Sequence, residues 1–298
     1  MKKFKKILNQ PELFLQLRMF IIVLLTLMFA ASGTRLLAQP GPGTIRIGGT
    51  GGALSAMQQL AKAFKKTHPD VNIVLFPSLG SSGGIRAVQE GALDIAISSR
   101  PLDDAERNRG LVAIEYAKTP FVFVISSKSS ITGLTTRQAV EIYEGGMQSW
   151  SDGSLIRLVM RPERDSDTAL LKSMSDAMKN AVQNALSRKG MIFAVTDKDS
   201  ADTIEKVPGA FGTSTLSQII SEKRSLKPLS IDSIEPSPEN IANGRYPYFK
   251  ILSIVTVPKP PSLTKHFIDY VRSKAGRDIL IRTGHWVNEP PDHAKTGH

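Results

Sequence analysis

Three short segments rich in glycine, serine and threonine each follow an apolar run and precede a stretch with helical spacing. The first N–H groups of a helix have no intrahelical acceptor, and the helix dipole places roughly half a positive charge there. Such turns favour anions, because glycine lets the backbone approach a ligand and hydroxyls donate further hydrogen bonds. Each segment alone is more typical of a plain strand-to-helix turn, so their repetition is the signal. The segments are Gly48-Gly49-Thr50-Gly51-Gly52, Gly80-Ser81-Ser82-Gly83-Gly84 and Asp165-Ser166-Asp167-Thr168.

A fourth segment of the same kind ends a predicted strand at Ser98-Ser99-Arg100-Pro101. Its hydroxyls stand beside a guanidinium that could pair with an oxyanion in bidentate fashion. An exposed loop arginine is the alternative interpretation. We expect the four segments to converge on one anion, with Ser166 as the N-cap of the helix that follows it.

The elements that must position these segments alternate from Thr44 onward as short apolar runs and helix-period stretches. This order is typical of βα units and predicts an α/β fold with a mainly parallel sheet. Leu170, Leu171, Met174 and Met178 form one helical stripe behind the third segment. Strands are expected near 45–47, 71–76, 93–98, 121–125, 156–160, 210–212, 226–229 and 250–257, and further helices near 54–68, 85–88, 137–143, 262–273 and 276–282.

Composition excludes several chemistries. The 298-residue chain has no cysteine, so disulfides, thiolate metal sites and cysteine nucleophiles are absent. The five histidines lack metal-ligand spacing on any predicted helix, and the first glycine-rich turn lacks the spacing of a dinucleotide fingerprint. We therefore expect no metal and no cofactor. The net charge is +11, of which residues 1–39 contribute +5, and scattered charges with 6% aromatics argue against a nucleic-acid partner.

Residues 1–39 are typical of a secretory signal peptide. Four lysines and Arg18 precede the uncharged run 19–31, which is too short to span a bilayer comfortably. We predict export to the periplasm, with cleavage after Ala38 or near Gly33. An uncleaved N-terminal membrane anchor is the alternative, and residues 291–298 are expected to form a loose tail.

From about Thr44 to Pro290 the chain resembles the periplasmic phosphate-binding proteins of phosphate ABC transporters. Several motifs together carry the resemblance. They are Gly80-Ser81-Ser82-Gly83-Gly84, the segment 91–102 (GALDIAISSRPL), Ile142-Tyr143-Glu144-Gly145-Gly146, Ser149-Trp150-Ser151-Asp152-Gly153, Pro208-Gly209-Ala210-Phe211-Gly212 and Asn243-Gly244-Arg245-Tyr246-Pro247.

The resemblance implies where the anion site lies. Thr50 with the Gly51 backbone matches the first anion-gripping turn of the family, and Ser81 matches the second. Ser99 falls where well-known members place a carboxylate. The remaining expected ligand residues are Arg161 or Arg164, at the position of the family's site arginine, and Ser166, Asp167 and Thr168, on its Ser-Gly-Thr triplet.

Two of these positions depart from the family pattern. The family's carboxylate accepts the proton of hydrogen phosphate, whereas Ser99 lacks that charge. Asp167 replaces a glycine and adds a negative charge near the anion. Asp167 either points outward or is itself the proton acceptor, and the preferred oxyanion stays open.

The resemblance further implies a two-lobed periplasmic binding protein fold of type II. Lobe one is expected from residues 44–122 plus 235–290, and lobe two from 123–234. The implied partners are phosphate or a similar oxyanion and the membrane permease of an ABC transporter, and the protein is expected to be a monomer and not an enzyme. Alternatives are an anion-sensing or adhesion protein of the same fold, a secreted phosphatase or other hydrolase, and a transcription-factor effector domain. The last is disfavoured because the N-terminus is typical of a signal sequence and not of a helix-turn-helix.

Overall fold

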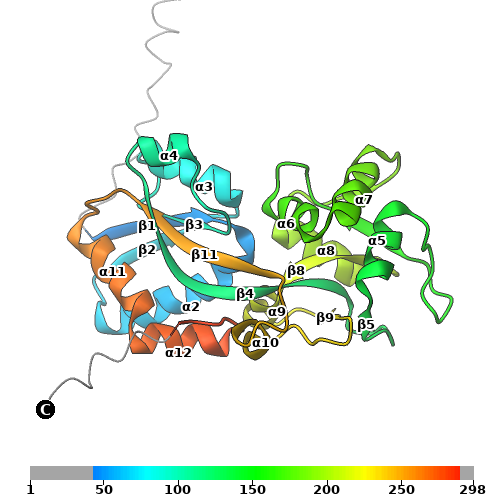
Figure 1. Cartoon of the computed structure of the whole chain (residues 1–298). Helices are drawn as coiled ribbons and strands as arrows, with labels where there is room; N and C mark the ends of the chain where they lie inside the picture. The colour runs from blue at the N-terminus through cyan, green and yellow to red at the C-terminus, as the bar shows by residue number, and fades with distance from the viewer. Residues whose placement is uncertain (1–42, 289–298) are drawn as a thin grey trace, which may run out of the picture. The chain divides into compact units, whose positions relative to one another are not determined.

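The computed structural model describes residues 43–288. Two groups of strands and helices flank a pair of long central strands, β4 (Val112–Ser126) and β11 (Phe249–Thr256) (Figure 1). We call these groups the first and second lobe. The first lobe contains β1 (Thr44–Gly49), β2 (Asn72–Leu75), β3 (Ile95–Ser98), α2 (Gly51–Thr67), α3 (Gly80–Gln89), α4 (Asp104–Asn108), α11 (Ser262–Arg272) and α12 (Lys274–Arg282).

The second lobe holds the remaining described elements. Its strands are β6 (Arg157–Met160), β7 (Ile192–Phe193), β8 (Ala210–Thr215) and β9 (Leu226–Pro228), with a small separate pair, β5 (Gly133–Leu134) and β10 (Ser230–Ile231). Its helices are α5 (Thr136–Glu144), α6 (Ser166–Met174), α7 (Asp176–Ser187), α8 (Asp197–Lys206), α9 (Leu216–Glu222) and α10 (Pro238–Ala242).

One sheet runs through both lobes in the order β2-β1-β3-β11-β4-β8-β6-β7, with β9 also on β4. Its two ends are parallel and its middle is antiparallel, since β11 and β4 run against their neighbours. The α/β fold is therefore confirmed, and the parallel βα units lie within the lobes. The expected bounds near residues 122 and 234 stay a prediction.

Strand β4 is longer than the run expected at 121–125, because it serves both lobes. Its first half pairs with β11 as far as Pro120 opposite Phe249, and its second half pairs with β8 from Phe121 onward. Proline has no N–H to donate to a ladder, so a change of partner at Pro120 suits its chemistry.

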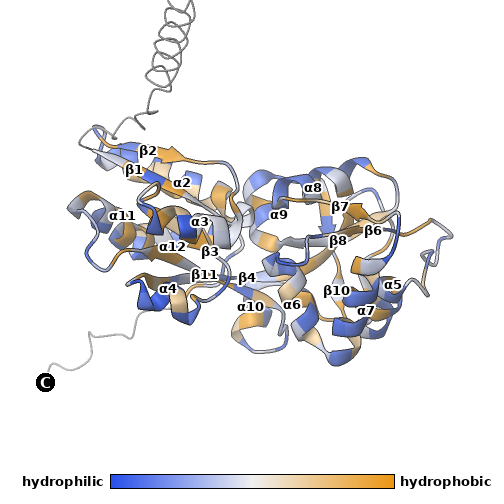
Figure 2. Cartoon of the chain, turned by 90° about the horizontal axis from the view of Figure 1, so that it is seen from above, coloured by the Kyte–Doolittle hydropathy of each residue, from blue (hydrophilic) through white to orange (hydrophobic). Residues whose placement is uncertain are grey.

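Helix α2 confirms the helix expected near residues 54–68, and its buried residues show the reason. Ala53, Met57, Leu60 and Phe64 recur three or four residues apart, and each is at most 1% exposed. They join one hydrophobic cluster with Ile45 of β1. Burying a large apolar side chain contributes about 1.5–3 kcal/mol. Figure 2 shows hydrophobic residues along the strands and both hydrophobic and hydrophilic residues on the helices around them.

The region behind the third glycine-, serine- and threonine-rich segment differs from the prediction in two ways. The N-cap of α6 is Asp165, whose carboxylate accepts from the Asp167 N–H, and Ser166 is the first helical residue. The predicted single stripe is also divided between α6 and α7, because Ser175 is extended and caps α7 through the Met178 N–H. The Asp165 carboxylate and the Ser175 hydroxyl each bond a nearby backbone N–H, and these local bonds set where α6 and α7 begin.

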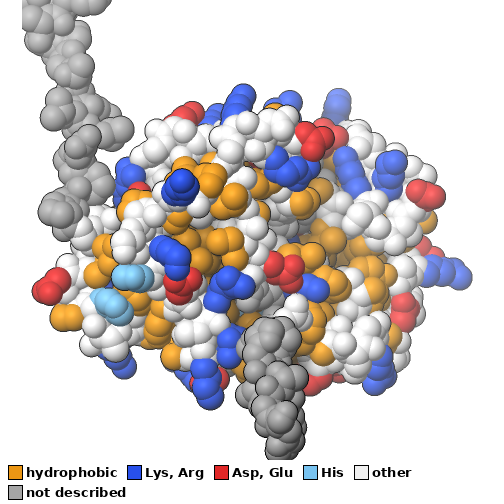
Figure 3. All heavy atoms as spheres, turned by 60° about the vertical axis from the view of Figure 1, so that its left-hand side comes forward, with side chains coloured by type: hydrophobic (Ala, Val, Ile, Leu, Met, Phe, Trp, Pro, Cys, Tyr) orange, Lys and Arg blue, Asp and Glu red, His pale blue; other side chains and the backbone are white. Residues whose placement is uncertain are grey.

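Among residues 43–288, no helix is both long and apolar enough to cross a membrane. The predicted signal peptide (1–39) and the tail (291–298) lie outside the described residues. On the face shown in Figure 3, Lys and Arg side chains are scattered among Asp and Glu instead of forming a stripe.

Candidate anion-binding site

A cleft of about 570 Å³ lies where the two lobes meet. It is lined by the predicted residues Thr50, Ser81, Ser99, Arg161, Arg164 and Ser166, which come from four distant parts of the chain. Arg100, Asp165, Thr196 and Asp197 also line it. Six of the predicted site residues therefore lie around one cleft.

The first wall of the cleft is the β1–α2 turn. Gly49 has φ +129°, and a Cβ there would lie 2.1 Å from the Ile97 carbonyl oxygen. This glycine lets the chain turn tightly against β3, where the Thr50 N–H donates to Ile97 O at 2.9 Å. Thr50 precedes α2 but does not cap it with its side chain. The first N–H groups of α2 therefore have no side-chain acceptor from their own N-cap.

A chain of hydroxyls crosses the cleft. Ser81 Oγ and Ser99 Oγ are 3.2 Å apart, and the Ser99 N–H donates to Ser81 Oγ at 3.0 Å. Ser99 Oγ in turn donates to Ser166 Oγ at 3.0 Å. These bonds join the start of α3, the end of β3 and the start of α6. Hydroxyls can rotate and donate to a ligand instead, so one bound oxygen could replace this chain.

Arg161 follows β6 directly and is only 4% exposed. Its Nη1 donates to Ala194 O at 2.9 Å and its Nη2 to Asp165 Oδ2 at 2.8 Å. Its Nε has no partner among the described residues. Burial opposes the guanidinium charge, but Asp167, Asp197 and Asp165 outweigh this and raise its pKa. Arg161 is thus a buried cation that lines the cleft and keeps one N–H donor without a partner among the described residues, which is a feature an anion would use.

Arg164 and Arg100 are placed differently from Arg161. Arg164 is exposed and lines the cleft. Arg100 is held by Glu106, with its Nη2 2.7 Å from Oε1, and by Ser82 at 3.0–3.1 Å. The Arg100 guanidinium is therefore already paired, and Arg161 is the arginine best placed in the interior of the cleft.

Asp167 and Thr168 do not line the cleft. The Asp167 carboxylate is 2% exposed, forms an ion pair with Lys250 of β11, and accepts from Thr213 Oγ1 at 3.0 Å. Burial pushes its pKa up, but Lys250 and Arg161 pull it down further, so the net shift is downward. Thr168 Oγ1 donates to Arg161 O at 3.2 Å. Both residues therefore fix the start of α6: Asp167 bonds to Lys250 and Thr213, and Thr168 bonds to the residue that follows β6.

Sequence reasoning missed helix α8, which brings Thr196 and Asp197 to the cleft. Thr196 caps the helix in a reciprocal capping box with Asp199, a signal present in Thr196-Asp197-Lys198-Asp199. The helix was missed because its buried apolar face is short, with Ala201 and Ile204 as its buried hydrophobic residues.

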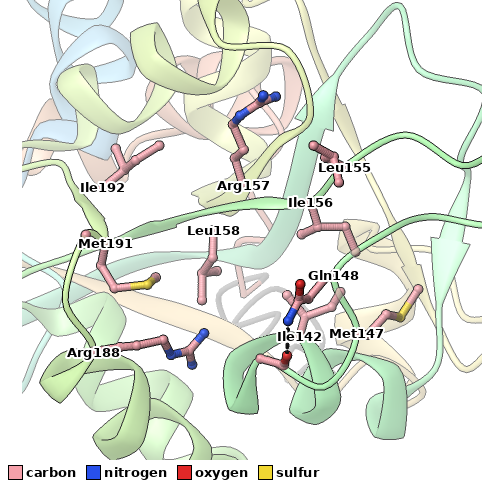
Figure 4. Close-up of a pocket in the computed structure, with 12 residues that line it drawn as sticks. Ile142, Met147, Gln148, Leu155, Ile156, Arg157, Leu158, Arg188, Met191 and Ile192 are labelled. Carbon is pink, nitrogen blue, oxygen red and sulfur yellow. Dashed lines mark hydrogen bonds between the residues drawn. The ribbon is translucent and has the colours of Figure 1, made fainter.

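A second cavity, of about 450 Å³, lies within the second lobe between α5, β6 and the region around residue 190. Figure 4 shows that Ile142, Leu158 and Met191 line it together with two arginines, Arg157 and Arg188. None of the predicted anion-site residues lines this second cavity.

A cleft between two α/β lobes, surrounded by helix N-termini, defines the chain as a protein of the two-lobed periplasmic binding protein fold. A family model described as a PBP superfamily domain matches residues 37–275, and the chain belongs to this superfamily.

Curated relatives and solved structures agree with this assignment. The chain is 27% identical to the phosphate-binding protein PstS of Bacillus subtilis over 78% of this chain and 76% of that protein. It is 26% identical to PstS of Borreliella burgdorferi over 80% and 88%. A putative phosphate ABC transporter substrate-binding protein from Clostridium perfringens, solved with bound phosphate, shares the fold with a TM-score of 0.70 and 24% identity, over 83% of this chain and 100% of that chain.

Proposed function

We propose that the chain captures inorganic phosphate, or a related tetrahedral oxyanion, for uptake by an ABC transporter. The observation that carries the proposal is the convergence of the starts of α2, α3, α6 and α8 on one cleft that also holds Arg161 with an unpartnered Nε. Helix N-termini and a buried guanidinium both favour negative charge. The names of the relatives from B. subtilis and B. burgdorferi support phosphate as the ligand.

The proposed contacts are direct hydrogen bonds from the cleft wall. Thr50, Ser81, Ser99 and Ser166 donate through hydroxyls, Gly51 through its N–H, and Arg161 through Nε. Arg164 attracts the anion at the cleft mouth. Asp167 and Thr168 support the start of α6 and do not touch the ligand.

The cellular role follows from the same proposal. The protein is exported to the periplasm, binds as a monomer and delivers its ligand to a membrane permease. It acts by recognition and not by catalysis, because binding by hydroxyls and amides requires no activated nucleophile.

Calorimetric titration with phosphate tests the proposal. Ser81→Ala and Arg161→Ala should each weaken binding about tenfold to a hundredfold, because a hydrogen bond to a charged group is worth about 1.5–3 kcal/mol. Arg164→Ala should have a smaller effect because its charge is exposed. Ser187→Ala on α7, whose hydroxyl bonds Gln183 O outside the cleft, is the matched control. Unchanged titrations in both Ser81→Ala and Arg161→Ala would end the proposal.

A thermal-shift scan ranks the possible anions. Phosphate, arsenate, sulfate and molybdate are each added at the same concentration and ionic strength. A ligand present at about one hundred times its Kd stabilises the folded state by about 2.7 kcal/mol. We expect phosphate and arsenate to raise the Tm most.

A further inference from the structure

Asp197 is the first residue of α8 and lines the cleft with 8% of its surface exposed. Its carboxylate accepts no hydrogen bond from any residue between 43 and 288. The nearest cationic nitrogen, Arg161 Nη2, is 3.8 Å from Oδ1, beyond hydrogen-bond distance. The Asp197 carboxylate oxygens can therefore accept a hydrogen bond from a ligand that enters the cleft.

The other two carboxylates near Arg161 are already occupied. Asp165 accepts from Arg161 Nη2 at 2.8 Å and from the Asp167 N–H at 2.9 Å. Asp167 accepts from Lys250 and from Thr213, and it does not line the cleft. The expectation that Asp167 could serve as the proton acceptor is thus disfavoured by its surroundings, and Asp197 is the acceptor left over.

The Asp197 carboxylate also lies beside the donors that an anion would use. A Cβ built on Gly51 would be 2.7 Å from Asp197 Oδ2, and one built on Gly52 would be 3.6 Å from Oδ1. The carboxylate thus lies against the first residues of α2. An anion bound at the start of α2 would have Arg161 and Asp197 as neighbours.

A free carboxylate at this place discriminates between anions by their protons. Sulfate carries no proton at neutral pH, so its oxygens can only repel the carboxylate. Inorganic phosphate keeps at least one proton, and its O–H can donate to the carboxylate in a short, charge-assisted bond. A site that pairs a ligand hydroxyl strongly rejects an analogue without one, because the buried acceptor is left unpaired.

We propose that Asp197 is the specificity-determining residue of the cleft, accepting the proton of hydrogen phosphate and excluding fully ionised anions. Asp197, which belongs to the second lobe, supplies the carboxylate that Ser99 of the first lobe lacks. The inference rests on the proposed function, since it presumes that the cleft binds phosphate.

The test compares phosphate and sulfate affinities of the wild-type protein and Asp197→Asn at pH 7 and constant ionic strength. The asparagine amide can donate to a sulfate oxygen, so we expect the preference for phosphate over sulfate to fall by about a hundredfold or more. Asp202→Asn makes the same charge change on α8 outside the cleft and should leave the preference unchanged. Asp197→Ser replaces the first variant if that one does not fold.

Two outcomes overturn the inference in distinguishable ways. If the wild-type protein binds phosphate and Asp197→Asn keeps the full preference, or if Asp165→Asn alone abolishes it, Asp197 does not select the ligand and the proposed function stands. If the wild-type protein binds neither anion, the proposed function fails and the inference fails with it.

Discussion

The cleft between the lobes and the second cavity both contain arginines, yet they are lined by opposite ends of helices. The cleft between the lobes is lined by the first residues of α3, α6 and α8 and by Thr50, which precedes α2. The second cavity is lined by Gly145 and Arg188, the C-cap residues of α5 and α7. One cavity therefore lies at the positive ends of helix dipoles and the other at their negative ends.

The difference decides what an arginine does in each place. Arg188 donates to Tyr143 O and Arg157 to Pro208 O, so both guanidiniums are used on backbone carbonyls. Within the part of the chain that the structure describes, no carboxylate lines that cavity. Arg161 is held by Asp165 and Ala194 but keeps its Nε free. The arginines near helix C-termini bind backbone carbonyls and stabilise the fold. Arg161, near helix N-termini, keeps one donor that an anion could accept.

The largest effect is expected outside the cleft, where Lys250 of the central strand β11 pairs with Asp167 of α6 in the second lobe. Lys250→Met would leave the Asp167 carboxylate buried, with Thr213 as its one side-chain donor among residues 43–288. Removing one partner of a buried ion pair costs about 3–5 kcal/mol, so urea denaturation should show a loss of that size. The double variant Lys250→Met/Asp167→Ala should regain most of it. A loss below about 1 kcal/mol in Lys250→Met would contradict the importance of this pair.

A paired substitution tests the comparison itself. Arg161→Ala should reduce phosphate affinity about tenfold to a hundredfold, since a charged hydrogen bond in the cleft is lost. Arg188→Ala should leave the affinity unchanged and lower the free energy of unfolding by about 1 kcal/mol, because the Tyr143 carbonyl loses its donor. Calorimetry and denaturation on both variants measure the two effects. An equal loss of phosphate affinity in both variants would contradict the claim that only the cleft between the lobes binds the anion.

A further effect concerns pH. Burial and the nearby Asp167 raise the pKa of Asp165 to about 6 from its ordinary value of 3.8, against the opposing pull of Arg161. The native state therefore holds this proton after the unfolded state has lost it, and stability from this group falls as pH rises from 3.8 through 6.

Asp165→Asn keeps an equally good N-cap and removes the titration. Between pH 4 and pH 7 we expect its free energy of unfolding to gain on the wild type by about 2 kcal/mol. Denaturation at both pH values measures the difference. A constant difference between wild type and variant would show that Asp165 titrates normally.

Much of the fold was predictable because local patterns carry it. The spacing of Met57, Leu60 and Phe64 predicted α2, and the glycine-rich turns predicted the starts of α2 and α3. The sequence could not predict that Asp165 would cap α6 in place of Ser166, because either side chain suits that position. It also missed α8, and with it Asp197, because a short apolar face gives little periodic signal.

By itself, the sequence determined which segments could grip an anion, since glycine, serine and threonine before a helix have that property wherever they lie. Only the tertiary structure decided which of these segments meet and which charged groups remain free there. Asp167 and Asp197 look alike in sequence, each within the first residues of a helix. Lys250, which is 83 residues away from Asp167 in the chain, forms an ion pair with Asp167. Asp197, in contrast, accepts no hydrogen bond from the residues that the structure describes. Pairing across such distances depends on packing, which local composition does not encode.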